Sequence, residues 1–271
     1  MKNADFVLAE ENYYSPEANE RYMSVSQYKD FVGSFGIPGC EAAAMARISK
    51  AYTEAPSTAM LVGSYVDAYF EGTIESFKKA HPEIFTLRGD LRAEYAHADR
   101  MIERVKQDEV FMAYMSGEKQ VIMTGELFGS KWKIKIDSYI PDVAIVDLKC
   151  MESLTKTKFV RDLGEYLDFI RYWGYDIQGA VYQEVVRQNT GKKLPFYIAG
   201  ISKEKVTNFD VIHVNDVFLV EALKSVESSM NHILDVKYGK VEACRCGKCD
   251  YCIATKKLIK PIGIPDLLDA V

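Results

Sequence analysis

The stretch KWKIKIDSYIPDVAIVDLK, residues 131–149, decides the fold of this chain. In its first half, hydrophobic and polar residues alternate, as they do in a strand with one buried face. Trp132 and Ile134 then lie on the buried face, and Asp137 lies on the opposite face among polar neighbours. The first half therefore predicts a strand that presents a carboxylate on its polar side.

The second half of the stretch predicts another strand, which ends in two charged residues. Four apolar residues, VAIV, precede Asp147, and Lys149 follows two positions later. Their side chains leave the same face, because alternate residues of a strand do so. A short turn at Pro141 and Asp142 makes the two strands neighbours. We therefore expect Asp137 and Asp147 to lie close together.

Two converging carboxylates and a lysine can hydrolyse a phosphodiester. Carboxylate oxygens are suitable ligands for Mg²⁺ or Mn²⁺. The ammonium of Lys149 can neutralise charge that develops on a phosphate, or, if its pKa is lowered, help to deprotonate the attacking water. A bare D-x-K tripeptide is more often a solvated strand end, so the surrounding elements decide between the two interpretations.

The remaining sequence predicts an α/β protein with a helical N-terminal part. The predicted helices cover residues 24–33, 41–52, 58–72, 91–116, 159–189 (with a break near Gly174) and 216–237. The predicted strands cover residues 119–127, 131–140, 143–149, 193–203 and 209–215. This order indicates a central mixed β-sheet flanked by helices. We expect one domain over residues 1–240 and a cysteine-rich tail, residues 241–271, packed on it.

The order of a strand ending in Asp, a tight turn, an apolar strand ending in D-L-K and a long helix resembles the PD-(D/E)XK nuclease superfamily. The resemblance extends to the recombination exonucleases of the RecE, RecB-nuclease and lambda-exonuclease type and their phage-borne relatives, over residues 24–255. It implies a restriction-endonuclease-like fold and a Mg²⁺- or Mn²⁺-dependent exonuclease for double-stranded DNA in phage-type recombination. A single-strand annealing protein is the implied partner, and oligomers occur among such exonucleases.

The resemblance also assigns the residues of the site. It implies that the metal is held by Asp67, Asp137, Asp147 and the backbone carbonyl of Leu148, and that Lys149 is the catalytic lysine. Asp67 lies in LVGSYVDAYFEG, four residues after a glycine, where the related proteins carry a histidine or a carboxylate. Its departure from histidine keeps a second interpretation open, a catalytically decayed DNA-binding protein with a cysteine metal knuckle.

A further motif follows on the predicted helix. Gln178 and Tyr182 in QGAVY match the Q-x-x-x-Y motif of the same families and lie one helical turn apart. We expect them to support the site and to contact DNA. Among the basic residues near the site, Lys156, Lys158 and Arg161 are the candidates for contacts with the phosphate backbone.

Four cysteines crowd into nine residues of the tail, which points to a metal in a reducing compartment. Cys246, Cys249 and Cys252 have C-x-x-C-x-x-C spacing, and Cys244 precedes them. The resemblance to RecB-like nucleases implies a 4Fe-4S cluster with these three ligands and Cys40 as the upstream fourth. Zinc bound by the four tail cysteines, Cys244 included, is one alternative, and a reduced turn without metal is another.

Composition is that of a globular protein, with 48% hydrophobic and 27% charged residues. The formal net charge of -5 gives no indication of a protein that coats nucleic acid through bulk charge. No stretch approaches the roughly 18 apolar residues of a membrane span, and the N-terminal residues lack the order of a signal peptide. We therefore expect a cytoplasmic protein.

Overall fold

The structure is a computed structural model that describes residues 6–258, 260–261 and 263–264. The chain divides into two compact units. The terminal unit comprises residues 1–54, 126–132 and 225–271, and the sheet unit comprises residues 55–125 and 133–224. The expected domain boundary near residue 240 falls within the terminal unit. Among the described residues, no helix is long and apolar enough to cross a membrane.

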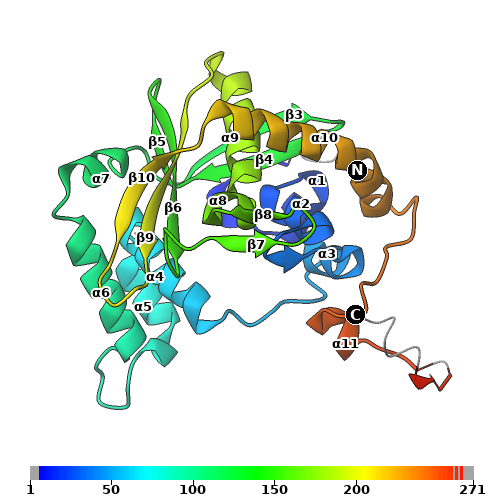
Figure 1. Ribbon diagram of the computed structural model, residues 1–271, viewed down its shortest axis with the longest axis horizontal. Coiled ribbons are helices and arrows are strands. Elements are labelled where there is room, and N and C mark those ends of the chain that lie inside the picture. Colours follow the sequence, from blue (N-terminus) through cyan, green and yellow to red (C-terminus); the bar gives the residue numbers. More distant parts are fainter. Residues whose placement is uncertain (1–5, 259, 262, 265–271) are drawn as a thin grey trace. The chain divides into compact units, whose positions relative to one another are not determined.

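The sheet unit is built on a four-stranded mixed sheet with the order β10-β9-β6-β5 (Figure 1). Its strands are β5 (Ser138–Ile140), β6 (Ala144–Met151), β9 (Phe196–Ser202) and β10 (Phe209–His213). Strand β6 runs parallel to β9, and the other two pairs are antiparallel. The parallel pair brings the carboxyl ends of β6 and β9 to the same edge of the sheet.

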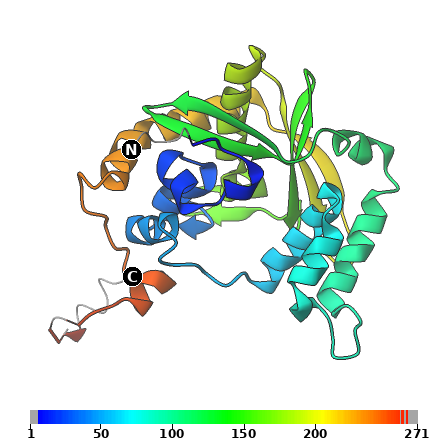
Figure 2. The same cartoon turned by 180° about the vertical axis from the view of Figure 1, so that it is seen from behind.

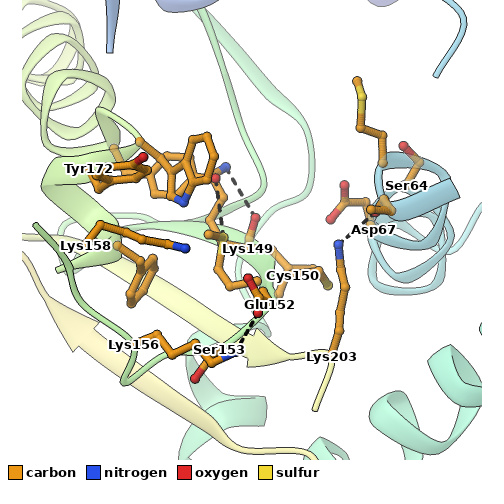
Figure 3. A pocket seen from close by; sticks show the side chains of 18 residues that line it. Ser64, Asp67, Lys149, Cys150, Glu152, Ser153, Lys156, Lys158, Tyr172 and Lys203 are labelled. Atoms are coloured by element: carbon orange, nitrogen blue, oxygen red, sulfur yellow. Dashed lines mark hydrogen bonds and ion pairs between the residues drawn. The ribbon is translucent and has the colours of Figure 1, made fainter. Parts of the chain in front are cut away.

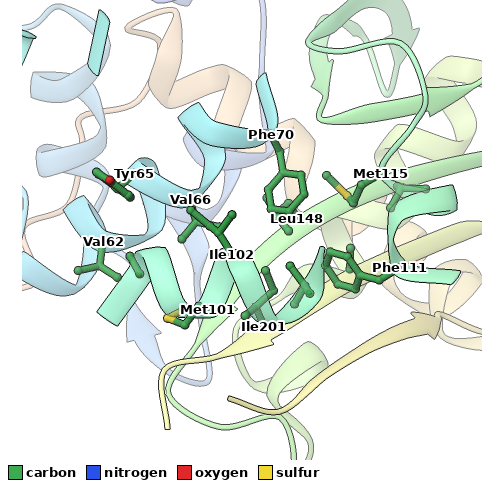
Figure 4. Close-up of a cluster of buried hydrophobic side chains, with 14 of the residues drawn as sticks. Val62, Tyr65, Val66, Phe70, Met101, Ile102, Phe111, Met115, Leu148 and Ile201 are labelled. Atoms are coloured by element: carbon green, nitrogen blue, oxygen red, sulfur yellow. The ribbon is translucent and has the colours of Figure 1, made fainter. Parts of the chain in front are cut away.

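Helices cover both faces of this sheet, which confirms the predicted fold class. The helical elements of the sheet unit are α4 (Thr58–Glu71), α5 (Ile74–Ala80), η2 (Pro82–Ile84), α6 (Ala93–Val105), α7 (Glu109–Tyr114), α8 (Phe169–Tyr172) and α9 (Tyr175–Thr190). Helices α4, α6 and α7 bury their apolar faces against Leu148 and Ile201 in one core (Figure 4). Helix α9 packs against Phe196, which points to the opposite face because it lies five positions from Ile201.

Local sequence explains where α4 begins and ends and why α9 can pack closely against the sheet. The side chain of Ser57 accepts a hydrogen bond from the backbone of Met60 and caps α4. Gly72 ends α4 in the left-handed conformation, at φ 79°. In α9, a β-carbon at Gly179 would come within 2.5 Å of the Phe196 ring, so glycine allows this helix to approach the sheet closely.

The predicted helix over residues 159–189 is wrong in its first part. Residues 158–167 form a hairpin of β7 (Lys158–Val160) and β8 (Glu165–Leu167). Phe159 pairs with Tyr166 across the two strands, and Gly164 takes a positive φ of 67° in the turn. The spacing of apolar residues in this short segment is compatible with a helix or with a hairpin. The turn at Gly164 selects the hairpin. The predicted break at Gly174 is present, between α8 and α9.

The terminal unit combines elements from the N-terminal and the C-terminal parts of the chain. Its elements are η1 (Glu10–Asn12), α1 (Pro16–Arg21), α2 (Val25–Val32), β1 (Gly33–Ser34), β2 (Ile37–Pro38), α3 (Glu41–Ile48) and α11 (Asp250–Ala254). Helix α10 (Asp216–Lys237) starts in the sheet unit and ends in the terminal unit. There the buried ammonium of Lys237 donates hydrogen bonds to the carbonyl of Tyr22 at 2.9 Å and to Gln27 Oε1 at 3.1 Å.

A hairpin contributes its tip to the terminal unit and its base to the sheet unit. It consists of β3 (Val121–Leu127) and β4 (Ser130–Ile136) (Figure 2). In the tip, Trp132 is fully buried, and its Nε1 donates a hydrogen bond to the carbonyl of Leu127. The base continues directly into Asp137, between β4 and β5, so the hairpin delivers the first predicted carboxylate to the sheet unit.

Candidate active site and cysteine cluster

Asp137 is linked to the strand that carries Asp147 and Lys149 by a hydrogen bond to the backbone of Leu148, which lies between them. Asp137 lies at the bend from β4 to β5, and its Oδ2 accepts a hydrogen bond of 2.9 Å from the backbone N–H of Leu148. Burial raises the pKa of Asp137 well above its usual range, and the charge of Asp147 raises it further. The two carboxyl groups therefore share one desolvated, electrostatically crowded site.

Asp147 is almost completely buried, with 2% of its surface exposed, and its two oxygens have different surroundings. Oδ1 accepts a hydrogen bond of 2.6 Å from Nε2 of Gln178. Oδ2 lies in ion-pair contact with the ammonium of Lys149, yet among the described residues no well-aligned hydrogen bond reaches it. A buried carboxylate oxygen with no such donor is an unusual feature, and it suits an oxygen ligand of a divalent cation.

Lys149 carries its ammonium into the centre of this site. Besides Asp147, the ammonium lies 3.4 Å from the carbonyl oxygen of Leu148 and 5.0 Å from the centre of the Tyr175 ring. Burial acts to lower the pKa of Lys149, but the charges of Asp147 and Asp137 outweigh burial and raise it above the usual value. The two carboxylates therefore favour the charged ammonium, which can neutralise negative charge on a phosphate.

Asp67 extends from α4 into the same site. Burial raises its pKa to about 7, while the charge of Lys149 lowers it and that of Asp147 raises it. Asp67 and Lys149 line the same pocket, which is described below. The predicted ligands Asp67, Asp137, Asp147 and the Leu148 carbonyl thus lie in one region of the sheet unit, and a divalent cation bound there would relieve the repulsion between the carboxyl groups.

The two residues of the Q-x-x-x-Y motif interact with each other, and each also contacts a different part of the site. Gln178 binds Asp147 directly, as described above. Tyr182 is buried, and its hydroxyl donates a hydrogen bond of 3.0 Å to the carbonyl of Lys135 in β4. Gln178 therefore orients a carboxylate, whereas Tyr182 fixes the strand that leads to Asp137.

These contacts predict different effects of two conservative substitutions. Tyr182→Phe should lower the free energy of unfolding by about 1 kcal/mol, because a buried carbonyl loses its donor, and should leave the cleavage rate nearly unchanged. Gln178→Leu should lower the cleavage rate about tenfold through a misoriented Asp147. Urea denaturation and initial-rate measurements on both variants check this expectation. A loss of activity in Tyr182→Phe as large as in Gln178→Leu would contradict it.

A pocket of about 640 Å³ opens beside this site (Figure 3). Asp67 and Ser64 face it from α4, and Lys158 faces it from the opposite wall. Lys156 also lines the pocket and forms an ion pair of 2.6 Å with Glu152. Arg161, the third predicted phosphate contact, is exposed in the β7–β8 turn and is not among the residues that line the pocket.

Sequence reasoning missed two polar residues of the site. Gln120 donates a hydrogen bond of 3.3 Å from Nε2 to Asp137 Oδ1, and no motif marks it. Lys203 lines the pocket, and its ammonium donates a hydrogen bond of 2.8 Å to the carbonyl of Ala59. No motif in the sequence marks Lys203 either. Its place just beyond β9, at the sheet edge where β6 also ends, was the available signal.

The terminal unit contains a second candidate site, formed by four cysteines. The Sγ atoms of Cys40, Cys246, Cys249 and Cys252 all lie within 4.8 Å of one another. Cys40 Sγ lies 3.6 Å from Cys252 Sγ, and Cys246 Sγ lies 3.9 Å from Cys252 Sγ. Cys244 is exposed and lies outside this group. The ligand set is therefore the one expected for the iron-sulfur cluster, with Cys40 and without Cys244.

The spacing of these sulfurs is that of a site for one ion. Zinc–sulfur bonds of about 2.3 Å in a tetrahedron place the sulfurs about 3.8 Å apart. A cubane cluster holds its four thiolates on different irons and therefore farther apart. Burial acts to raise the pKa of Cys246, but backbone N–H groups of Lys248 and Cys249 lower it to about 6. These donors favour a thiolate, the form that binds metal.

Comparison with known proteins places the chain in a family. The model of the family described as "PDDEXK-like domain of unknown function (DUF3799)" matches residues 24–255. The crystal structure of a "Putative exonuclease" from Eubacterium rectale is 59% identical and covers 98% of this chain and 100% of its own, with a TM-score of 0.95.

A second solved structure and the curated proteins provide no further information about the family. The crystal structure of a protein called SSO0001 is 12% identical, covers 77% of this chain and 89% of its own, and has a TM-score of 0.29, which supports no inference. No curated protein matches the chain. The chain belongs to the PDDEXK-like DUF3799 family and, with it, to the PD-(D/E)XK nuclease superfamily.

Proposed function

We propose that this protein is a metal-dependent deoxyribonuclease that acts as an exonuclease on double-stranded DNA in phage-type recombination. The observation that carries the proposal is the buried pair Asp137 and Asp147 beside Lys149, whose ammonium is in ion-pair contact with Asp147. The family and the 59% identical "Putative exonuclease" support nuclease activity. Such an enzyme would work in the cytoplasm, with a single-strand annealing protein as partner for the DNA strand that it exposes.

The residues divide the chemistry among them. Asp137, Asp147, the carbonyl of Leu148 and Asp67 would hold Mg²⁺ or Mn²⁺. When bound, the ion polarises the phosphate and acidifies a coordinated water. Lys149 places a positive charge where negative charge develops on the scissile phosphate, in a desolvated site where such a charge is most effective. The Asp67 carboxylate replaces the histidine of related proteins and adds an oxygen ligand to the set.

A digestion assay tests the activity. End-labelled linear DNA, nicked circles and closed circles are incubated with the protein in Mg²⁺ or Mn²⁺ and in EDTA. We expect linear DNA to be shortened from its ends in either metal, and closed circles to stay intact. Cleavage of closed circles would show that the protein is an endonuclease and not an exonuclease. DNA binding without cleavage of any form would support the alternative, a decayed DNA-binding protein, although the complete set of Asp137, Asp147 and Lys149 argues against decay.

Metal binding should stabilise the fold at this site. A ligand that binds only the native state at a hundredfold excess over its Kd adds about 2.7 kcal/mol. Millimolar Mn²⁺ should therefore raise the Tm of the wild type by several degrees and leave that of Asp147→Ala almost unchanged. Asp90→Ala is the matched control, because Asp90 is exposed in a loop and should respond like the wild type. An equal rise in all three proteins would place the metal elsewhere.

For the cysteine cluster, we propose one tetrahedral zinc ion bound by Cys40, Cys246, Cys249 and Cys252. The sulfur distances of 3.6 Å and 3.9 Å support a single ion. The alternative is the 4Fe-4S cluster, which the resemblance to RecB-like nucleases implies. Metal analysis and the absorption spectrum of anaerobically purified protein distinguish colourless zinc protein from brown iron-sulfur protein. Either metal would join α3 to the tail of the terminal unit.

A further inference from the structure

Aromatic side chains form one wall of the pocket beside the candidate active site. This wall comprises Phe169, Tyr172, Trp173 and Tyr175, from α8 and the start of α9. Phe169 is buried, but the other three are half-buried and line the pocket. The rings of Tyr172 and Trp173 meet edge to face, with centroids 5.0 Å apart. Aromatic rings that served only packing would be covered, whereas these contribute surface to an open pocket (Figure 3).

The break between the two helices places these rings beside the reacting groups. Asp168 caps α8 by accepting hydrogen bonds from the backbone of Ile170 and Arg171. Gly174 then takes a positive φ of 65°, so that α9 starts in a new direction immediately after Trp173. The ring of Tyr175, the first residue of α9, lies 5.0 Å from the ammonium of Lys149. The aromatic wall and the catalytic lysine are thus in contact.

The charge of the pocket matches a polyanion. Four lysines line it, Lys149, Lys156, Lys158 and Lys203, against two acidic residues, Asp67 and Glu152. In Figure 3 the ammonium of Lys158 is directed into the pocket from below Tyr172. A ligand that satisfies both the lysines and the rings carries negative charges and flat aromatic faces, as a nucleotide strand does.

We propose that Trp173 forms a stacking platform for an unpaired base next to the scissile phosphate, with the Tyr172 ring standing edge to face beside it, so that the pocket accepts nucleic acid as a single strand. The proposal rests on the proposed nuclease function. A base within a duplex has both faces covered by its neighbours, so only an unstacked base can use a protein ring. A blunt duplex would therefore enter through its frayed terminal nucleotides, and the platform favours that frayed state.

The chain provides its own optical probe for this platform. It contains only two tryptophans, Trp132 and Trp173. Trp132 is fully buried, with its Nε1 bonded to the carbonyl of Leu127, whereas Trp173 lines the pocket. In Ca²⁺ in place of Mg²⁺, we expect a short oligothymidylate to quench the tryptophan fluorescence of the wild type, and the blunt duplex of oligothymidylate and oligodeoxyadenylate to quench it much less. Trp132→Phe should retain the quench, and Trp173→Phe should lose it.

Kinetics in Mg²⁺ or Mn²⁺ separate stacking from a structural role. Trp173→Ala should raise KM for a single-stranded oligonucleotide about tenfold, as the loss of one stacked base does, with a smaller change in kcat. Trp173→Phe, which keeps a flat ring, should restore KM. Tyr172→Ala should weaken binding in the same direction. Thermal melting shows whether each variant is folded, and Tyr172→Ala provides the kinetic result if Trp173→Ala fails to fold.

Three results would overturn the platform: equal quenching by the duplex and the single strand, quenching that persists in Trp173→Phe, or an unchanged KM in both Trp173→Ala and Tyr172→Ala. Failure of the proposed function gives a different result, because no DNA would then be cleaved in Mg²⁺ or Mn²⁺, while the fluorescence titration in Ca²⁺ would still report whether a single strand occupies the pocket.

Discussion

Replacing Lys149 by alanine is expected to lower the rate of DNA cleavage by about 10²- to 10³-fold, the loss seen when one preorganised charge or donor is removed from a transition state. DNA binding should change little, since most of the affinity comes from other phosphate contacts. The physical reason is the position of the ammonium, which lies in ion-pair contact with Asp147 and 3.4 Å from the Leu148 carbonyl. Single-turnover rates and fluorescence-anisotropy binding measure the two effects separately.

The control for this prediction is Lys205→Ala. Lys205 is exposed and is not among the residues that line the pocket, so its removal takes away the same charge without touching the site. Its cleavage rate should stay within about twofold of the wild type, as expected for an exposed charge. If Lys149→Ala lost binding and cleavage in equal measure, Lys149 would be a phosphate anchor and not a group that stabilises the transition state.

Replacing Cys40 by serine is expected to release the metal of the cysteine cluster and to lower Tm by about 10 °C. A metal that joins Cys40 to Cys252 closes a loop across a sequence separation of 212 residues. Loops of this order carry about 5 kcal/mol of closure entropy, and about 1 kcal/mol corresponds to 2–4 °C in a chain of this size. Metal content by mass spectrometry and a thermal scan check both parts.

Cys244→Ser is the matched control, because it removes a neighbouring thiol that lies outside the four-cysteine group. The backbone of Cys244 accepts a hydrogen bond from Ala42 and donates one to Glu41, and its side chain also donates to Glu41. Serine keeps the backbone bonds and has a hydroxyl that can donate in place of the thiol. Metal content and Tm should therefore stay those of the wild type. Loss of metal from Cys244→Ser with retention in Cys40→Ser would reverse the ligand assignment and restore the knuckle formed by the tail cysteines alone.

The placement of Asp137, Asp147 and Lys149 could be predicted because it depends on local rules. Side chains of a strand alternate, and a tight turn makes successive strands neighbours. Both rules act within 19 residues, and the register of β5 on β6 confirms that these strands pair. The predicted ligand set itself remains a proposal.

The contributions of Gln120 and Lys203 could not be predicted, since they depend on how distant segments pack. Gln120 precedes β3 and reaches Asp137 across 17 residues, with a positive φ of 53° that no sequence rule assigns to glutamine. Lys203 reaches the site because β9 pairs in parallel with β6. The same limit applies to Cys40, whose position beside the tail cysteines followed from family resemblance and not from any local pattern.

The division of the chain has a consequence for synthesis on the ribosome. The sheet unit is complete once residue 224 has emerged, but the terminal unit needs residues 1–54 and residues beyond 225. Cys40 therefore leaves the ribosome 212 residues before Cys252, which at 5–20 residues per second is a delay of about 10–40 s. During that interval its thiol is exposed to oxidants and foreign metals. The Cys40 thiol would therefore lack its partner ligands until Cys246, Cys249 and Cys252 have been translated.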